Sequence, residues 1–332
     1  MRINLRFWSR PTSLAAGQPK PPVPPPVPST PGMAPDQRVP SQEAPGLPSV
    51  VTDARLEAAL LASARRHGLK DAGIVLLDLN GRRVAAMNGD KAFSAASVIK
   101  LPLMAAVMQG VEAGTLSLDQ LVTIKAQNQT GTWLPEGDRR PLLRPGMKVP
   151  IARLLELMIS RSDNVATNNL MDLVSREDLA KGFADFGAPN TRLVRKLSAG
   201  RTVSDPDYQG GRNETTARDM QALMERLSEE KLVSPDASAR MKTWLGLQWD
   251  RDKLPSGLPK GVKVYSKTGE TSKVTHDVML AESDSQRYIL VVLTALPPGG
   301  NTWRRMGAFS RDMWNALEPA KSPPQATPSS GG

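Results

Sequence analysis

Cysteine is absent from this 332-residue sequence, and histidine occurs only at His67 and His276. The lack of cysteine excludes disulfide frameworks, thiol nucleophiles and cysteine-ligated zinc. Two histidines do not supply the histidine-rich ligand sets that catalytic zinc prefers. The sequence therefore predicts a protein that works without a metal ion or another cofactor.

Long apolar runs and aromatic residues are also scarce. No run approaches the roughly 18 residues of a membrane-spanning helix, so we expect no transmembrane segment. The formal net charge is +10 without a basic block, a balance that suits nucleic acid, an anionic surface or carboxylate substrates. Aromatic residues make up only 4% of the chain, few for stacking on single-stranded nucleic acid, so we expect no nucleic-acid partner.

Proline is concentrated at the two ends of the chain. Of 29 prolines, 13 lie in residues 1–50 and four in residues 318–332. This composition predicts a disordered, proline-rich leader over 1–50, a globular domain over 51–317 and a disordered tail over 318–332. The first 17 residues carry three arginines but lack the apolar core of a secretory signal, so no signal peptide is recognised.

Hydrophobic periodicity predicts the order of helices and strands in the globular part. Helices are predicted over 53–68, 98–114, 215–230 and 303–317, a helix-rich segment over 151–174, and strands over 263–267, 275–281 and 287–296. Asn80–Gly81, between two apolar runs, predicts a hairpin with a two-residue turn. The predicted fold is α/β (α+β), with an antiparallel sheet formed by N- and C-terminal strands, flanking helices and an inserted all-helical subdomain.

Ser97 and Lys100 form the first motif with chemical potential. Ser97 stands at a predicted helix start, where unpaired backbone N–H groups can stabilise an oxyanion. Lys100 lies one turn further on the same face, and a desolvated lysine can take the proton of a serine. Read alone, Ser97 is more simply a helix cap, and Ser228 and Lys231 repeat the spacing in a charged stretch where no chemistry is expected.

Two further motifs combine polar residues with an apolar background. Ser162-Asp163-Asn164 interrupts an apolar helical region, and three polar residues there need partners. They are either a helix cap or a proton relay with an amide that holds substrate. Lys267-Thr268-Gly269 ends a predicted strand and is either a plain strand end or an edge that binds a substrate carboxylate.

Together the three motifs are far more specific than any one of them. Ser-x-x-Lys, Ser-Asp-Asn and Lys-Thr-Gly, in this order, are the signature of class A β-lactamases and penicillin-binding proteins. Over roughly residues 53–317 the chain resembles this serine β-lactamase and penicillin-binding family. The hairpin segment IVLLDLNGRRVAAMN also resembles the first two strands of the family. The resemblance implies a β-lactamase/transpeptidase-like fold.

The resemblance implies an acyl-enzyme mechanism. In the family, a serine attacks the carbonyl of a β-lactam or of a D-alanyl peptide of peptidoglycan. Carried over, Ser97 is the nucleophile and Lys100 its base, and Ser162 passes a proton to the leaving nitrogen. The backbone N–H groups of Ser97 and Glu270 would form the oxyanion hole.

The resemblance also implies how the substrate is held. Asn164 would bind the acylamido side chain, and Lys267 and Thr268 would hold the carboxylate, with Gly269 allowing close approach. Trp133, in the segment GTWLPEG, is a candidate for an aromatic ring at the mouth of the pocket, and a core or loop-packing role is the alternative.

One element of the family pattern is missing. Class A β-lactamases use a loop glutamate after the Ser-Asp-Asn helix to activate the water that hydrolyses the acyl-enzyme. The corresponding segment, VRKLSAGRTVSDPDYQGGR, contains no glutamate, and the position falls near Ser198–Arg201. Asp205 and Asp207 are the nearest carboxylates and could serve in deacylation.

Three functions follow as alternatives. The first is a β-lactamase-like serine hydrolase with slow deacylation, the second a penicillin-binding DD-peptidase acting on D-alanyl peptides, and the third a non-catalytic cell-wall binding module. The partner in each case is a small-molecule β-lactam or a D-alanyl peptide. The family also leads us to expect a periplasmic or extracellular location.

Overall fold

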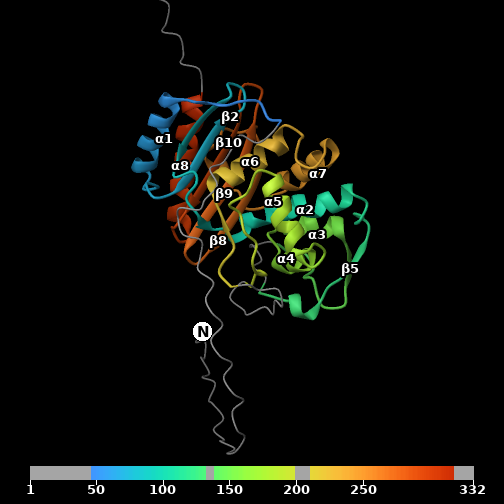
Figure 1. Ribbon diagram of the computed structural model, residues 1–332. Coiled ribbons are helices and arrows are strands. Elements are labelled where there is room, and N and C mark those ends of the chain that lie inside the picture. The colour runs from blue at the N-terminus through green and yellow to red at the C-terminus, as the bar shows by residue number, and fades with distance from the viewer. Residues whose placement is uncertain (1–45, 132–137, 199–209, 318–332) are drawn as a thin grey trace, which may run out of the picture. The chain divides into compact units, whose positions relative to one another are not determined.

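The computed structural model describes residues 46–131, 138–198 and 210–317 (Figure 1). Its strands are β1 (Val51–Thr52), β2 (Gly73–Asp78), β3 (Arg83–Met87), β4 (Phe93–Ser94), β5 (Leu121–Thr123), β6 (Lys148–Pro150), β7 (Glu214–Thr215), β8 (Lys263–Thr271), β9 (Val274–Glu282) and β10 (Arg287–Thr294). Its α-helices are α1 (Ala54–Arg66), α2 (Lys100–Glu112), α3 (Ile151–Ser160), α4 (Asn164–Met171), α5 (Arg176–Asp185), α6 (Ala217–Ser228), α7 (Pro235–Gly246) and α8 (Gly300–Leu317). Short 3₁₀ helices are η2 (Ala96–Ile99), η3 (Ala126–Asn128) and η4 (Leu254–Gly257).

The main sheet joins the two ends of the globular part. Its strand order is β1-β3-β2-β10-β9-β8, and every neighbouring pair is antiparallel except β1 and β3. β10 pairs with β2 from Tyr288 opposite Asp78 to Leu293 opposite Gly73. The prediction of one sheet built from N- and C-terminal strands is therefore confirmed. The order places β8, which carries the Lys-Thr-Gly motif, at one end of the sheet.

Both faces of this sheet are covered by helices. Side chains alternate between faces along a strand. Accordingly, Ile74 and Leu76 join the apolar core beneath α1 and α8, whereas Val75 and Leu77 join the larger core on the α2 and α6 side. Figure 1 shows α1 and α8 together on one face of the sheet. This double burial explains why β2 and β10 read as continuous apolar runs.

The predicted hairpin forms, but its turn is longer than expected. The last pair between β2 and β3 joins Asp78 to Arg83, which leaves four residues in the connection instead of two. The Asp78 carboxylate accepts hydrogen bonds from the backbone N–H groups of Asn80 and Gly81, at 3.0 and 3.1 Å. An aspartate that binds the backbone two and three residues on stabilises such a turn locally. This side-chain interaction overrides the Asn-Gly preference for a two-residue turn.

The segment between the two halves of the sheet is mainly helical. It holds α2 to α7 and also the short strand pair β5 and β6. The helix-rich segment predicted over 151–174 forms two helices, α3 and α4, separated by Arg161–Asp163, where the polar motif was expected to interrupt the helical pattern. Asp163 caps α4 by accepting from the backbone N–H of Ala166 at 2.9 Å. The Ser-Asp-Asn motif therefore occupies a break between helices.

The described N-terminal end contacts the domain. The carbonyl oxygens of Gly46 and Pro48 accept hydrogen bonds from Lys231 and Arg82, and Val50 packs against the larger core. Within the described ranges, no helix combines the length and the apolar character that a membrane crossing requires.

Candidate active site

The first motif folds as a 3₁₀ turn that leads directly into α2. Ser97 lies in η2, and Lys100 begins α2 with its backbone N–H bonded to the carbonyl of Ser97. Because side chains three residues apart eclipse each other in a 3₁₀ helix, Ser97 and Lys100 share one side of this turn. Ser97 is partly exposed, whereas the Lys100 side chain is fully buried. Ala96, with φ of +43°, adopts the left-handed conformation that residues other than glycine rarely take.

Ser162 connects the lysines of the other two motifs. The ammonium groups of Lys100 and Lys267 each lie 3.1 Å from Ser162 Oγ. Lys100 also donates to Ser162 O at 2.7 Å and to Asn164 Oδ1 at 2.8 Å, and Lys267 donates to Thr268 O at 2.7 Å. The structure therefore brings Lys100, Ser162, Asn164 and Lys267, which are up to 167 residues apart, into one hydrogen-bonded group.

This group favours a neutral lysine. Burial, reinforced by the positive charge of Lys267, holds the pKa of Lys100 well below its ordinary value of 10.5. Burial also lowers the pKa of Lys267 to about 7. A lysine whose pKa is lowered by burial loses its proton more readily and can then accept one from a serine hydroxyl. The arrangement therefore supplies a base next to Ser97 and a hydroxyl between two nitrogen atoms that can carry a proton.

The backbone at Ser162 is held in an unusual conformation. Its φ is +53°, in the left-handed region. Such a conformation costs about 1–3 kcal/mol and persists only where the surroundings enforce it. Asp163 provides part of this enforcement, because its carboxylate caps α4 and also pairs with Arg140 at 3.1 Å. This constraint aims Ser162 Oγ at the two lysines.

The third motif lies on an end strand that passes against the turn that holds Ser97. A Cβ atom at Gly269 would lie only 3.0 Å from the backbone nitrogens of Ser97 and Val98. Only glycine permits this approach. β8 ends the strand order, and such a strand leaves alternate backbone N–H groups free for other partners. Gly269 thus has a packing reason for its identity, in addition to the carboxylate-binding role that the motif implies.

The side chain of Glu270 is engaged outside the catalytic group. Its Oε1 accepts from Trp303 Nε1 at 2.8 Å and lies 3.1 Å from the ammonium of Lys253. These contacts leave the backbone N–H as the group that Glu270 can offer to a substrate. They fit the expectation that Glu270 contributes its amide.

A cavity of about 810 Å³ adjoins these residues. The predicted site residues on its wall are Ser97, Ser162, Asn164, Thr268 and Glu270. Lys100 and Lys267 are fully buried beside it. Trp133, Asp205 and Asp207 lie outside the described residues, so their predicted roles stay predictions.

One wall of the cavity is the start of the loop that lacks a glutamate. Arg195, Lys196, Leu197 and Ser198 line it. The side chain of Asn168 donates to Leu197 O at 2.9 Å and accepts from Leu197 N at 2.8 Å. These two hydrogen bonds fix the backbone at Leu197. Sequence reasoning missed them, although Asn168 is a buried amide that needed partners.

Two further residues that the sequence analysis did not single out fix the same wall. The buried Lys196 ammonium lies 2.7 Å from Asn128 Oδ1 and 2.6 Å from Asp172 Oδ1. Asn213 accepts from the backbone N–H groups of Val194 and Arg195, at 2.9 and 3.1 Å. The start of the loop is therefore held by Asn128 and Asp172, which lie earlier in the chain, and by Asn213, at the far end of the loop.

Both ring nitrogens of His276 bind backbone groups, which gives this side chain a structural role. Its Nδ1 accepts from the backbone N–H of Thr294 at 3.1 Å, so its Nε2 carries the hydrogen and donates to Ser94 O at 2.7 Å. Burial lowers the pKa of His276 to about 4, which keeps the ring neutral at pH 7. The ring therefore ties β9 to the segment just before the Ser97 turn.

The second Ser-x-x-Lys spacing is not a site. Ser228 ends α6, and its Oγ accepts from Arg287 at 3.0 Å. The Lys231 ammonium donates to Gly46 O at 2.6 Å. The serine and the lysine thus have separate partners, as the sequence analysis expected.

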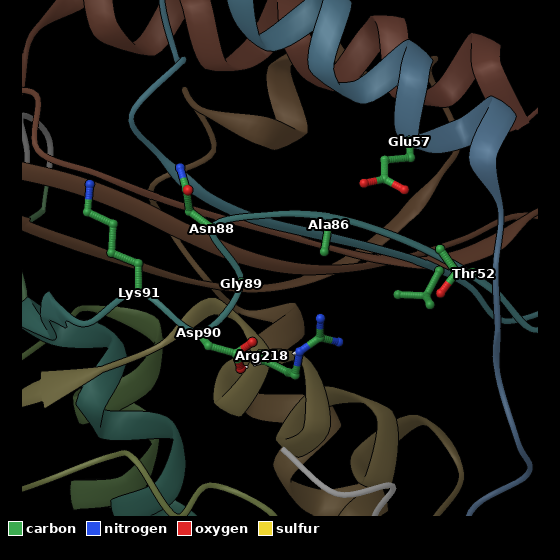
Figure 2. A pocket seen from close by; sticks show the side chains of 9 residues that line it. Thr52, Glu57, Ala86, Asn88, Gly89, Asp90, Lys91 and Arg218 are labelled. Carbon is green, nitrogen blue, oxygen red and sulfur yellow. Dashed lines mark ion pairs between the residues drawn. The ribbon is translucent and has the colours of Figure 1, made fainter. Parts of the chain in front are cut away.

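A second hollow, of about 720 Å³, contains none of the three motifs (Figure 2). It is lined by small and charged residues, and Arg218 pairs there with Asp90 at 3.4 Å. Among residues 46–131, 138–198 and 210–317, no group of three metal-ligating side chains occurs. The cavity beside Ser97 is therefore the candidate active site.

The fold and the three motifs together define a class of protein, the serine hydrolases that act through an acyl-enzyme. Comparison with known families identifies the family within this class. A model described as "Beta-lactamase enzyme family" matches residues 55–317, and the chain belongs to this family.

Individual relatives come from both branches of the family. The extended-spectrum β-lactamase PER-1 of Pseudomonas aeruginosa is 27% identical over 191 residues, which are 55% of this chain and 59% of that protein. The D-alanyl-D-alanine carboxypeptidase DacA of Escherichia coli K12 is 27% identical over 255 residues, 72% of this chain and 58% of that protein. The chain thus spans just under three fifths of the length of these relatives.

Solved structures agree on the fold. PBP-A aligns with a TM-score of 0.69 at 24% identity, over 81% of this chain and 98% of that one. A β-lactamase from Sphaerobacter thermophilus aligns with a TM-score of 0.67 at 26% identity, over 79% and 97% of the two chains. The β-lactamase/transpeptidase-like fold is therefore confirmed.

The coupling between the two buried lysines gives a testable pH dependence. Replacing Lys267 by Gln removes a positive charge that lowers the pKa of Lys100. The Lys100 pKa then rises, and the neutral base forms only at higher pH. We expect the acidic limb of the acylation rate to move to higher pH, measured with penicillin from pH 5 to 10. Lys181→Gln, which removes a lysine from the surface of α5, should leave the limb in place. An unmoved limb in Lys267→Gln would show that the lysines are not coupled.

Proposed function

We propose that the protein is a serine hydrolase that forms an acyl-enzyme with β-lactams on Ser97 and hydrolyses it slowly. The observation that carries this proposal is the position of Ser162 Oγ, 3.1 Å from both buried ammonium groups beside the Ser97 turn. Two desolvated lysines around one hydroxyl form a relay that can move a proton between a nucleophile and a leaving group.

The proposed acylation step uses this relay. Lys100, in its neutral form, takes the proton of Ser97 as Ser97 Oγ attacks the carbonyl carbon of the β-lactam. The C–O bond forms and the ring C–N bond breaks. The leaving nitrogen receives a proton from Ser162, which is replenished from Lys100. The 3.1 Å distance between Lys100 Nζ and Ser162 Oγ supports the second of these transfers, from Lys100 to Ser162.

Binding groups surround the reacting atoms in this proposal. The backbone N–H groups of Ser97 and Glu270 would stabilise the oxyanion, which is worth roughly 10²–10³-fold per donor. Asn164 would hold the acylamido group, and Lys267 and Thr268 the carboxylate. Of these residues, Ser97, Asn164, Thr268 and Glu270 line the cavity. Lys267 does not line it, but its ammonium donates to the carbonyl oxygen of Thr268.

We expect slow hydrolysis of the acyl-enzyme because the cavity wall has no unpaired carboxylate, among the described residues, to activate a water molecule. Among the described residues, the carboxylates on the cavity wall belong to Asp250 and Glu270. Asp250 pairs with Lys253, and Glu270 with Lys253 and Trp303. Neither is free to act as the general base, and the loss of such a base slows its step by roughly 10²–10⁴-fold.

The second candidate is a penicillin-binding DD-peptidase that acts on D-alanyl peptides. The similarity to a D-alanyl-D-alanine carboxypeptidase over 72% of this chain supports it. The same catalytic group would acylate with either substrate. Because peptidoglycan lies outside the cytoplasmic membrane, we also propose a periplasmic or extracellular location.

A labelling experiment separates the alternatives. The purified protein is incubated with a fluorescent penicillin, unlabelled penicillin is added in excess, and the bound label is followed over time. The proposed function predicts rapid labelling followed by loss over many minutes. Label that persists for hours would favour the DD-peptidase, and loss within seconds an efficient β-lactamase. A protein that takes up no label would be a non-catalytic cell-wall binding module, and the proposal would be wrong.

A further inference from the structure

Arg161 and Trp249 form a stacked pair on the cavity wall next to Ser162. The guanidinium carbon of Arg161 lies 4.0 Å from the centre of the Trp249 ring, and both residues line the cavity. The backbone N–H of Trp249 donates to Ser160 O at 3.0 Å, which ties the two segments together. A guanidinium stacked on an indole is held in one plane with its N–H groups free at the edge.

The contacts of Arg161 leave much of its donor capacity unused. Its Nε lies 3.8 Å from Asp138 Oδ2. Asp138 is held more closely by Arg140, which also pairs with Asp163. Among the described residues, no other acidic side chain pairs with Arg161, whose side chain is 25% exposed. Its two terminal nitrogens therefore form a fork that a carboxylate in the cavity can fill.

The lysines near the cavity leave room for a further partner of the carboxylate that Lys267 and Thr268 would hold, because neither lysine offers a planar fork of donors. Lys267 is fully buried and already donates to Ser162 Oγ and Thr268 O. Lys253 is also fully buried, and its charge is matched by Asp250 and Glu270. The guanidinium of Arg161, in contrast, presents a planar fork of donors that matches the geometry of a carboxylate.

We propose that Arg161 binds the carboxylate on the leaving-group side of the substrate and makes the protein selective for substrates that carry it. This inference rests on the proposed function, in which Ser162 protonates the leaving nitrogen. A β-lactam or a D-alanyl peptide bears its free carboxylate next to that nitrogen, and Arg161 directly precedes Ser162 in the chain. Thr268, on the same cavity, supplies a hydroxyl for the same group.

The test compares benzylpenicillin with its methyl ester. For each compound, the second-order rate of acylation is measured on the full chain by mass spectrometry of the intact protein. In Arg161→Gln, the rate with the free acid should fall by about 10- to 100-fold, the effect of losing a charge-assisted hydrogen bond. The rate with the ester should stay within about 2-fold of wild type, which also shows that the variant is folded. Arg161→Lys keeps the charge but loses the fork of donors. Its rate with the free acid should lie between the rates of wild type and Arg161→Gln.

Arg195→Gln is the matched control, because Arg195 is an exposed arginine on the loop wall of the same cavity. It should leave the ratio between acid and ester unchanged. Equal losses for acid and ester in Arg161→Gln would overturn the inference and assign Arg161 a structural role. If Arg195→Gln instead lowers the rate with the free acid but not with the ester, the inference is wrong, and Arg195 binds the carboxylate. If wild type is acylated by neither compound, the proposed function itself fails, and this inference fails with it.

Discussion

Ser97→Ala is expected to abolish covalent labelling by penicillin, with a loss of acylation of about 10⁶-fold. The substitution removes one hydroxyl from a partly exposed side chain and leaves η2 and the buried Lys100 in place. The fold should therefore be unchanged, and non-covalent binding of penicillin should persist. Intact-protein mass spectrometry and a melting curve measure the two effects on one sample.

Ser228→Ala is the control that this chain itself offers, because Ser228 and Lys231 have the same spacing as Ser97 and Lys100. Its hydroxyl contacts Arg287 at the end of α6, so the expected change in labelling is nil. A covalent adduct that survives in Ser97→Ala would show that another residue is the nucleophile. A loss of label in Ser228→Ala would mean that the wrong serine has been assigned.

The strands of the main sheet could be predicted from the sequence because each strand has a local signal. β10 and β2 are buried on both faces, and their apolar runs identify them without knowledge of their neighbours. The break within residues 151–174 lies at the polar motif that interrupts the apolar pattern, and the helix-cap interpretation of this motif is correct for Asp163. The left-handed backbone of Ser162 has no sequence signal. α5 and α7 were missed because their apolar stripes are short and mixed with charge.

The catalytic group was predicted in a different way, through three motifs whose order matches a known family. Their spacing in sequence says nothing about the distances between Ser162, Lys100 and Lys267, which only the fold supplies. The Arg161–Trp249 pair and the hydrogen bonds between Asn168 and Leu197 were not predicted at all. Both join residues of ordinary type across 29 or more positions, and no local pattern marks such contacts.

The acyl-enzyme is expected to accumulate during turnover of a penicillin. In the proposed mechanism, acylation uses Ser97, Lys100 and Ser162, whereas hydrolysis also needs a base for water, and the segment from 194 to 212 contains no glutamate. If hydrolysis is slower than in an enzyme with the base by roughly 10²–10⁴-fold, most molecules should carry the acyl group at steady state. Mass spectrometry of the quenched protein measures this fraction directly.

Leu197→Glu tests the same idea in the opposite direction. Leu197 lines the cavity and also packs against the larger core, and two hydrogen bonds with Asn168 fix its backbone, so a carboxylate introduced there starts from a fixed point on the cavity wall. We expect the variant to lose its acyl group at least about 10-fold faster than wild type. Leu197→Gln has nearly the same shape without a base and should deacylate like wild type. If wild type hydrolyses penicillin rapidly without a detectable adduct, slow deacylation is wrong. Asp205→Asn and Asp207→Asn would then reveal which loop carboxylate serves as the base, because only the replacement of that residue would make the adduct appear.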